Sequence, residues 1–411
     1  MTGVRRLGCR QIGLVIGYLA CLSCAAGCAA DGAGRWDSLY AGGRDLAGWR
    51  EVGGGKWSVE NGEIVGRTGD GRYGWLVTDQ EYADFILELE GRHEGDGNSG
   101  IQFRSHVIHG TMYGWQADFD PSCNGKHNGV YDEGGKRQWI ALPKGKAITA
   151  VRPRDWNRYR ITAVGDHVTV EINGIRTADF HDSQFTRGII ALQVHQGKQP
   201  PVHVRFRNIR IRPLDENRGF TPLFDGKSLA GWHVAGREKW TVENGEIVAQ
   251  CRQNAAYCYL LSDRQYGDFS VKLKFLCDSQ TGNSGFFFHS TIAGVDINGP
   301  QAEISSRPGE HTGLIYGPAG RGWLNMDQWD ALKDAVYRVK QWNELEVQSV
   351  GPHIVVHLNG WPISDVTDDK LPRTGMFALQ MHSGEAMKIR FKDIYYRPPT
   401  PAQEPARGGS E

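Results

Sequence analysis

Residues 168–174 read Val-Thr-Val-Glu-Ile-Asn-Gly, and residues 354–360 read Ile-Val-Val-His-Leu-Asn-Gly. In each stretch an extended run leads into Asn-Gly, the commonest two-residue hairpin turn, and a second extended run follows. Residues 269–275 alternate apolar and polar side chains, as a strand with one buried face requires. Many short strands and glycine turns of this kind predict an all-β chain built as an antiparallel sandwich or jelly roll.

The two hairpins belong to an internal repeat with an offset of about 183 to 187 residues. Lys-Trp-Ser-Val-Glu-Asn-Gly-Glu-Ile-Val at 56–65 returns, with Thr for Ser, at 239–248, and Gly-Asn-Ser-Gly at 97–100 returns at 282–285. The order of the matches never breaks. The chain therefore contains the same unit twice.

A period this long indicates a duplicated domain rather than a solenoid, because each copy is large enough to bury its own core. The matches predict one domain over residues 36–214 and a second over 219–398, joined by a short polar linker. The Pro- and Gly-rich residues 399–411 predict a disordered tail.

The composition excludes several classes of protein. The chain has 411 residues, 47 Lys and Arg against 47 Asp and Glu, 39% hydrophobic residues and 54 glycines. These values exclude disorder, coiled coil and collagen. No basic run interleaves with aromatic residues, so a nucleic-acid partner is not expected, and no protein partner can be inferred.

The first 28 residues predict an export signal, because basic residues precede an apolar stretch that ends in small residues. Ala-Ala-Gly-Cys at 25–28 resembles the lipobox of bacterial lipoproteins, in which Cys28 is acylated and anchors the protein to a membrane. Ala25 departs from that box, where Leu is usual, and the alternative is a cleaved signal peptide. Both readings place the protein outside the cytoplasm, as a periplasmic protein or an outer-membrane lipoprotein.

The folded part holds few cysteines, and none has the spacing of a zinc site. Cys251 and Cys258 lie seven residues apart around a candidate turn. A disulfide between them is one possibility in an oxidising compartment, but spacing alone does not show it.

Polar pairs in the interior of predicted strands indicate where function resides. Members of a pair are separated by one residue, so both side chains are expected on one face of the sheet. Matching strands of the second copy repeat the scheme, which predicts a polar concave groove in each copy; the alternative is a solvated outer face. The residues are Gln102 with Arg104, Gln116 with Asp118 and Gln193 with His195 in the first copy, and His289, Gln301 with Glu303, and Gln380 with His382 in the second.

Asp132 and Glu133, followed by Arg137 and Trp139, are interpreted as a loop that can close over the first groove. The matching stretch of the second copy, which holds Arg321 and Trp323, lacks the two acids. The two tryptophans are candidates for stacking on a sugar ring, and the two arginines for binding substrate.

The ordered motifs carry a family resemblance over nearly all of the chain after residue 35, twice. They include Trp-x-Val-Glu-Asn-Gly-Glu-Ile-Val, Asn-Ser-Gly-Ile-Gln-Phe-Arg at 98–104, Tyr-Gly-Trp-Gln-Ala-Asp at 113–118 and Leu-Gln-x-His. The set resembles the domain of unknown function 1080, also called the 3-keto-disaccharide hydrolase domain. The resemblance implies two tandem concanavalin A-like jelly rolls that act on an oligosaccharide or keto-sugar ligand.

The chain departs from the family pattern at specific positions. Many members have a glutamate two residues before the glutamine that matches Gln116 or Gln301, where this chain has Gly114 and Gly299. His289 also stands where the family has the arginine that matches Arg104.

The implied chemistry uses the acidity of the C2 proton beside a C3 ketone. A base removes that proton, the C1 substituent leaves by elimination, and water adds afterwards. His195 is the expected base, Arg104 the donor to the enolate, and Asp118 a group that orients the histidine or binds a divalent cation. Sugar hydroxyls would be held by Gln102, Gln116 and Gln193. The corresponding residues of the second copy are His382, His289, Glu303, Gln301 and Gln380.

Other functions stay open at this stage. A glycosidase with paired carboxylates fits less well, because only one acid per domain is expected on the face. Both copies, or the second alone, could instead only bind glycan, or the second could be an inactive wall. The sequence leaves the cofactor unknown, with a divalent cation possible.

Overall fold

The computed structural model describes residues 35–122, 128–196 and 202–399. The predicted export signal with Cys28, and the predicted tail from residue 400, lie outside the described residues. Within those ranges the chain is almost entirely β-structure in antiparallel sheets, as the strand patterns predicted. No helix there is long and apolar enough to cross a membrane.

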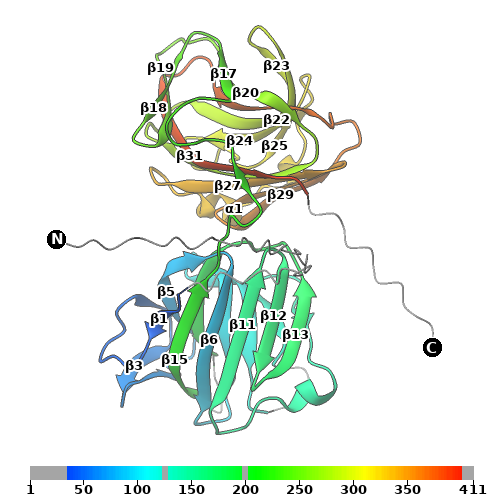
Figure 1. Cartoon of the computed structure of the whole chain (residues 1–411). Coiled ribbons are helices and arrows are strands. Elements are labelled where there is room, and N and C mark those ends of the chain that lie inside the picture. The colour runs from blue at the N-terminus through cyan, green and yellow to red at the C-terminus, as the bar shows by residue number, and fades with distance from the viewer. Residues whose placement is uncertain (1–34, 123–127, 197–201, 400–411) are drawn as a thin grey trace, which may run out of the picture. The chain divides into compact units, whose positions relative to one another are not determined.

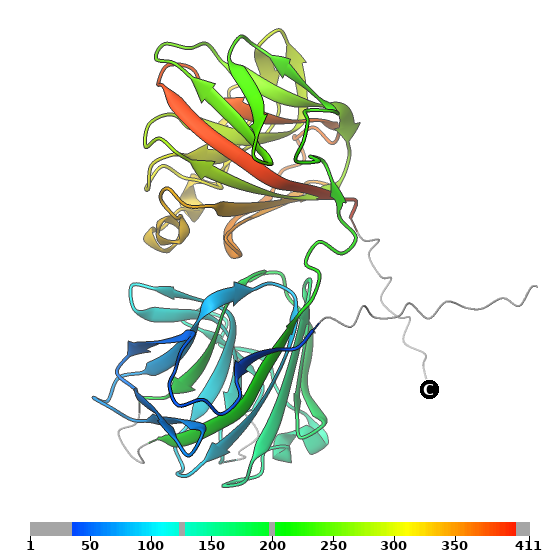
Figure 2. The same ribbon diagram turned by 60° about the vertical axis from the view of Figure 1, so that its left-hand side comes forward.

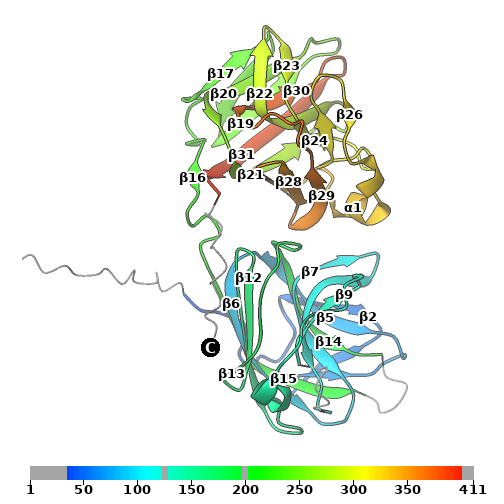
Figure 3. The ribbon, with the colours of Figure 1, turned by 90° about the vertical axis from the view of Figure 1, so that its right-hand side faces the viewer.

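Two sheets form the first copy, and Figure 1 shows the strands of one of them side by side. That sheet runs β13 (Ile175–His181), β12 (His167–Ile172), β11 (Asn157–Val164), β6 (Phe85–His93), β15 (His203–Pro213), β4 (Glu63–Arg67) and β3 (Lys56–Glu60), with β1 (Asp37–Tyr40) on β15. The other, whose strands are visible in Figure 3, runs β10 (Trp139–Ala141), β9 (Val130–Glu133), β8 (Thr111–Phe119), β7 (Ser99–Ile108), β14 (Gly188–Val194), β5 (Gly74–Tyr82) and β2 (Trp49–Gly53). A short 3-10 helix spans Gly145–Thr149.

The second copy repeats this plan, and Figure 2 shows that each copy has two layers of strands. One sheet runs β18 (Lys239–Glu243), β19 (Glu246–Cys251), β31 (Met387–Arg397), β21 (Phe269–Cys277), β27 (Asn343–Val350), β28 (His353–Leu358) and β29 (Trp361–Thr367), with β16 (Thr221–Pro222) on β31. The other runs β17 (Trp232–Ala235), β20 (Cys258–Tyr266), β30 (Gly375–Met381), β22 (Asn283–Ala293), β24 (Gln301–Ser305), β25 (Ile315–Gly317) and β26 (Gly322–Trp323), with β23 (Asp296–Asn298) on β22. A 3-10 turn (Met326–Gln328) and the one-turn helix α1 (Ala331–Val336) follow β26.

Both predicted Asn-Gly hairpins are present. In the first copy β12 pairs with β13, and the turn residues Asn173 and Gly174 have φ of 53° and 78°. Asn359 and Gly360 have φ of 53° and 80° between β28 and β29. Positive φ at both central residues is the geometry that suits the right-handed twist of a hairpin, and Asn and Gly adopt it most readily.

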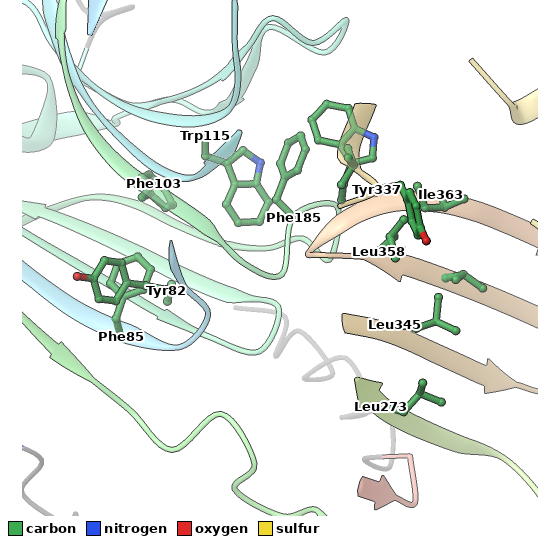
Figure 4. Packing of buried hydrophobic residues seen from close by; sticks show 14 of the residues in the cluster. Tyr82, Phe85, Phe103, Trp115, Phe185, Leu273, Tyr337, Leu345, Leu358 and Ile363 are labelled. Atoms are coloured by element: carbon green, nitrogen blue, oxygen red, sulfur yellow. The ribbon is translucent and has the colours of Figure 1, made fainter. Parts of the chain in front are cut away.

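Each copy buries its core between its own two sheets. In the first copy the ring of Trp115 lies 5.8 Å from Phe103 and 5.7 Å from Phe185 (Figure 4). In the second copy Leu345 lies between Leu273 and Leu358 across β21, β27 and β28, and all three are fully buried. Residues that alternate with these core side chains therefore point to the outer face of a sheet.

The cysteines of the second copy are free thiols in this structure. Cys251 and Cys258 are both buried, and the indole nitrogen of Trp240 lies 3.4 Å from the Cys258 sulfur. No disulfide joins the pair.

Candidate functional site

The first-copy polar face consists of Gln102, Gln116, Asp118, Glu133 and Gln193, on the outer side of the sheet that holds β7, β8, β9 and β14. These residues alternate with core residues along their strands, and the register places Gln102 directly opposite Gln116. The structure therefore brings together the three predicted amides and Asp118, and adds Glu133 to them.

The polar side chains of this face form one continuous chain of hydrogen bonds. Gln102 donates to Gln116 Oε1 at 2.7 Å and to Glu133 Oε2 at 3.5 Å. Gln193 donates to the same Glu133 oxygen at 3.3 Å, and Gln116 donates to Asp118 at 3.3 Å. The amide hydrogens thus converge on two carboxylates, which fixes the orientation of every side chain in the chain.

Glu133 is the functional candidate that the sequence interpretation missed. The expected loop at 132–133 is wrong, because these residues end strand β9, and Tyr131 and Glu133 share its outer face. Burial and the nearby charge of Asp118 raise the pKa of Glu133 to about 7. The expectation of one acid per face is also wrong for the first copy, which has two. Alternation with core Val130 was the signal available in the sequence.

Arg104 does not lie on the polar face, contrary to the expectation that it shares a face with Gln102. A bulge interrupts the ladder between Phe103 and His106, and Arg104 takes a left-handed backbone with φ of 47°. Its guanidinium is fully buried and donates to the carbonyls of Ala83, Gly165 and Phe185 and to the carboxylate of Asp84. Because these acceptors occupy its guanidinium, Arg104 has a structural role and does not donate to substrate.

His289 occupies the same bulge in the second copy, with φ of 47°. Its Nε2 lies 2.9 Å from the carbonyl oxygen of Gly267, and its ring packs on Phe269 and Phe288. Burial lowers its pKa, so the ring is held neutral. The expected role of His289 toward an enolate is not supported by this position.

His195 lies at the end of β14 with both ring nitrogens engaged. Nε2 is 3.1 Å from the hydroxyl of Tyr73, and Nδ1 is 2.9 Å from the carbonyl oxygen of Gln196. His382 makes the matching contacts with Tyr257 at 3.0 Å and Ser383 at 2.8 Å. A ring whose Nδ1–H donates to a carbonyl and whose Nε2 accepts from a phenol has no free lone pair for a substrate proton.

Two aromatic residues beside His195 were not singled out from the sequence. Tyr73 stacks on Trp75 with 5.7 Å between ring centroids, and meets His195 edge-on at 4.7 Å. Trp75 pairs directly with Gln193 across β5 and β14, so it belongs to the same face. The second copy has Tyr257 stacked on Tyr259 in the same arrangement.

Arg137 and Arg321 form ion pairs with other segments of their own copies rather than contacts with the amides and acids of the polar faces. Arg137 pairs with Asp132, on the opposite side of β9 from Glu133, and with Asp182. Arg321 pairs with Asp368 in the second copy. These ion pairs occupy both guanidinium groups, so the structure does not support their expected contact with substrate.

Trp139 and Trp323 lie on short strands rather than in open loops. Trp139 is directly opposite Tyr131, with the rings edge to face at 5.2 Å, and Trp323 is opposite Tyr316 at 5.3 Å. Because Tyr131 shares a face with Glu133, the Tyr131–Trp139 pair borders the first-copy polar face. Such a pair offers an apolar surface that can stack on a sugar ring.

The second-copy face keeps only part of this arrangement. Gln301 donates to Glu303 at 2.8 Å and to Gln380 at 3.4 Å, so the predicted amides and acid are again together. Burial raises the pKa of Glu303 to about 8. However, the register places Phe287 where the first copy has Gln102, and Pro318 where it has Glu133. The second face therefore lacks a carboxylate at the position of Glu133, and its one acid, Glu303, is the counterpart of Asp118.

A metal site is not evident in residues 35–122, 128–196 and 202–399, where no group of three or more His, Cys, Asp and Glu side chains is placed to hold an ion. A hollow of about 500 Å³ lies elsewhere, on the other sheet of the first copy, beside Trp36 and Glu88. The Glu88 carboxylate there already pairs with Arg158, Arg160 and Arg210. The amide and carboxylate cluster, rather than this hollow, has the chemistry of a site.

Comparison with known proteins agrees with the duplication. Residues 35–212 and 219–397 each match the 3-keto-alpha-glucoside-1,2-lyase-like domain. Among solved structures, a protein from Parabacteroides distasonis described as a candidate glycosyl hydrolase is 20% identical, with a TM-score of 0.33, over 46% of this chain and 98% of its own. Carbohydrate-binding module CBM66 from Bacillus subtilis is 14% identical, with a TM-score of 0.31, over 41% of this chain and 95% of its own. No curated protein sequence matches. The chain thus belongs to the 3-keto-alpha-glucoside-1,2-lyase-like family, of which it carries two tandem domains.

Proposed function

We propose that the first copy cleaves 3-keto-glycosides, with Glu133 as the base that removes the C2 proton. The observation that carries this proposal is the position of Glu133: a partly buried carboxylate, held by the amides of Gln102 and Gln193, whose pKa is raised to about 7. A base of near-neutral pKa suits removal of a proton beside a ketone, because it is ionised at working pH and still basic.

In the proposed step, the C2–H bond breaks and the proton passes to the Glu133 carboxylate. The electron pair forms an enolate with the C3 carbonyl, then returns to make the C1–C2 double bond as the C1–O bond breaks. The leaving oxygen takes the proton back from Glu133, and water added at C1 completes net hydrolysis. One carboxyl group can serve as base and then acid in this cycle.

Arg104 is unable to stabilise the enolate, so another donor is needed. As Glu133 takes up the proton, it becomes a weaker acceptor for the amide hydrogens of Gln102 and Gln193. Those hydrogens are then the nearest donors on the face for the enolate oxygen.

Two other functions have specific support. The pairing of Glu133 with Asp118 on one face also suits an ordinary glycosidase, in which Glu133 would be the acid. The Tyr131–Trp139 pair suits glycan binding without catalysis. The family description and the Glu133 environment together favour cleavage of the keto substrate.

The test compares 3-keto-trehalose and a methyl 3-keto-glucoside with their unoxidised parents, followed by NMR. We expect 3-ketoglucose, or its unsaturated 2-hydroxy-glycal, from the keto substrates alone. Glu133→Gln should abolish this product, whereas Glu303→Gln, which changes the raised-pKa acid of the second copy, should leave it. Cleavage of the parents would indicate an ordinary glycosidase, and saturable binding without product would indicate a binding protein.

The export and membrane anchor predicted from residues 1–28 form a separate proposal. We expect Cys28→Ser to abolish incorporation of labelled palmitate when the whole chain is expressed in a bacterial host. Release of the unchanged protein without label would support the cleaved signal peptide instead.

A further inference from the structure

The first-copy face holds two buried polar atoms that nothing in the described residues satisfies. The indole nitrogen of Trp75 and the amide oxygen of Gln193 both lack a hydrogen-bond partner there. Trp75 is 4% exposed and Gln193 is fully buried. An unsatisfied buried donor or acceptor is costly and therefore rare in folded proteins, so two of them on a candidate site point to a ligand.

These two atoms belong to residues that face each other. Gln193 and Trp75 are a directly opposed pair across β14 and β5, and opposed side chains on one sheet face lie within contact distance. One atom is a donor and the other an acceptor. Together they match a group that can both accept and donate a hydrogen bond.

The surrounding contacts fix both atoms in place. The Gln193 amide nitrogen donates to Glu133, which directs the amide oxygen away from that carboxylate. The Trp75 indole is stacked on Tyr73, whose hydroxyl is held by His195. His195 is thus a positioning residue for the indole, which gives the Tyr73–His195 contact a use in binding.

The second copy provides an internal comparison. Its equivalent pair is Tyr259 and Gln380, opposed across β20 and β30. Gln380 accepts from Gln301 at 3.4 Å, and neither Tyr259 nor Gln380 has a buried polar side-chain atom without a partner. The second copy therefore lacks the unsatisfied pair that Trp75 and Gln193 form in the first.

We propose that Trp75 and Gln193 form a subsite for one sugar hydroxyl, which accepts from the indole N–H and donates to the amide oxygen. A ketone oxygen accepts but has no hydrogen to donate, so this subsite takes a hydroxyl-bearing carbon and excludes the keto carbon. Because Gln193 also contacts Glu133, the bound hydroxyl orients the sugar relative to the reacting carbon. The inference rests on the proposed function, since it assumes that this face binds a glycan.

The experiment uses the full protein and a methyl 3-keto-glucoside with its 4-deoxy, 6-deoxy, 4-fluoro and 6-fluoro analogues. One position should be discriminated by roughly 10- to 100-fold in kcat/KM, with the fluoro analogue no better than the deoxy one, because fluorine cannot donate to Gln193. Trp75→Phe should lower kcat/KM for the methyl 3-keto-glucoside. For the deoxy analogue that lacks the bound hydroxyl, Trp75→Phe should change kcat/KM by no more than a few-fold. Tyr259→Phe is the matched control and should preserve the preference.

The outcomes separate the subsite from the chemistry. If no keto substrate is cleaved but the Kd values show the same hydroxyl preference and its loss in Trp75→Phe, the cleavage proposal fails and the subsite stands. If cleavage occurs and Trp75→Phe, with an unchanged Tm, keeps the full preference, the subsite is overturned while the chemistry survives. Equal use of all analogues, or no glycan binding, also overturns the subsite.

Discussion

Glu133 lies directly across the β8–β9 ladder from Gly114. Gly114 has φ of +139°, and a Cβ there would come within 2.3 Å of the Ser105 hydroxyl, so no larger residue fits without a backbone shift. The position at which the family resemblance implies a glutamate is therefore closed in this chain. The second carboxylate of the first-copy polar face comes instead from Glu133 on the neighbouring strand β9.

The pH dependence of cleavage should report Glu133. Its pKa of about 7 means that the carboxylate, the form needed for a base, increases as pH rises through 7. We expect kcat/KM to rise with pH through this region, and Glu133→Gln to lower it by roughly 10²- to 10⁴-fold. A fall in kcat/KM over the same range would indicate that Glu133 acts as an acid.

Substitution of His195 should have a smaller effect than substitution of Glu133. Because both ring nitrogens are engaged, His195→Ala is expected to loosen Tyr73 and Trp75, raising KM more than it lowers kcat. The rise of kcat/KM through pH 7 should persist. Steady-state kinetics test this, with His382→Ala as the control in the second copy. Loss of the pH dependence in His195→Ala would restore the histidine as the base.

Arg104→Ala should act on stability. It leaves the Asp84 carboxylate and the carbonyls of Ala83, Gly165 and Phe185 without their guanidinium, a loss of about 3–5 kcal/mol by comparison with other buried ion pairs. The measurement is the free energy of unfolding in urea, with the exposed Arg72→Ala as the control. Turnover per folded molecule should change little. A stable variant that has lost kcat would contradict the structural role.

Trp139→Ala should weaken glycan binding without removing catalysis. The loss of stacking is expected to raise Kd by about 10-fold, with kcat within a few-fold, because the Tyr131–Trp139 pair borders the face. Titration calorimetry provides the measurement. Trp323→Ala, the matched change, shows whether the second copy contributes to affinity, and equal losses would indicate that both copies bind glycan.

Glu303 should make the protein less stable at high pH. Its pKa is about 8 in the folded protein against 4.5 ordinarily, so the native state holds a proton that the unfolded chain releases between these values. The resulting stabilisation is full below pH 4.5 and is lost as pH rises through 8. The Tm difference between Glu303→Gln and the unchanged protein should therefore shift in favour of the variant between pH 5 and pH 9. The exposed Glu243→Gln should show no such trend.

The sequence was sufficient for the fold because its signals are local. Asn-Gly turns and the two-residue alternation determine where strands turn and which side chains are buried, as β12 and β21 show. The grouping of Gln102, Gln116, Asp118 and Gln193 followed from the same alternation. The repeat then supplied the number of domains without any comparison to other chains.

The remaining errors arise where alternation stops. The bulge at Arg104 adds a residue to one strand and turns its side chain toward the core, and no composition signal marks it. Glu133 was missed because a four-residue strand between Gly-rich segments resembles a loop. The occupied nitrogens of His195 depend on Tyr73, a contact 122 residues away along the chain that sequence spacing cannot show.

The bulge that both copies share indicates the order in which the bulge and the duplication arose. The same backbone detour, with φ of 47°, is filled by Arg104 in one copy and by His289 in the other. A common ancestor with the detour explains this more simply than two independent insertions at matching sites. The kink is thus older than the duplication, whereas the side chain at its centre diverged afterwards, to arginine in one copy and histidine in the other.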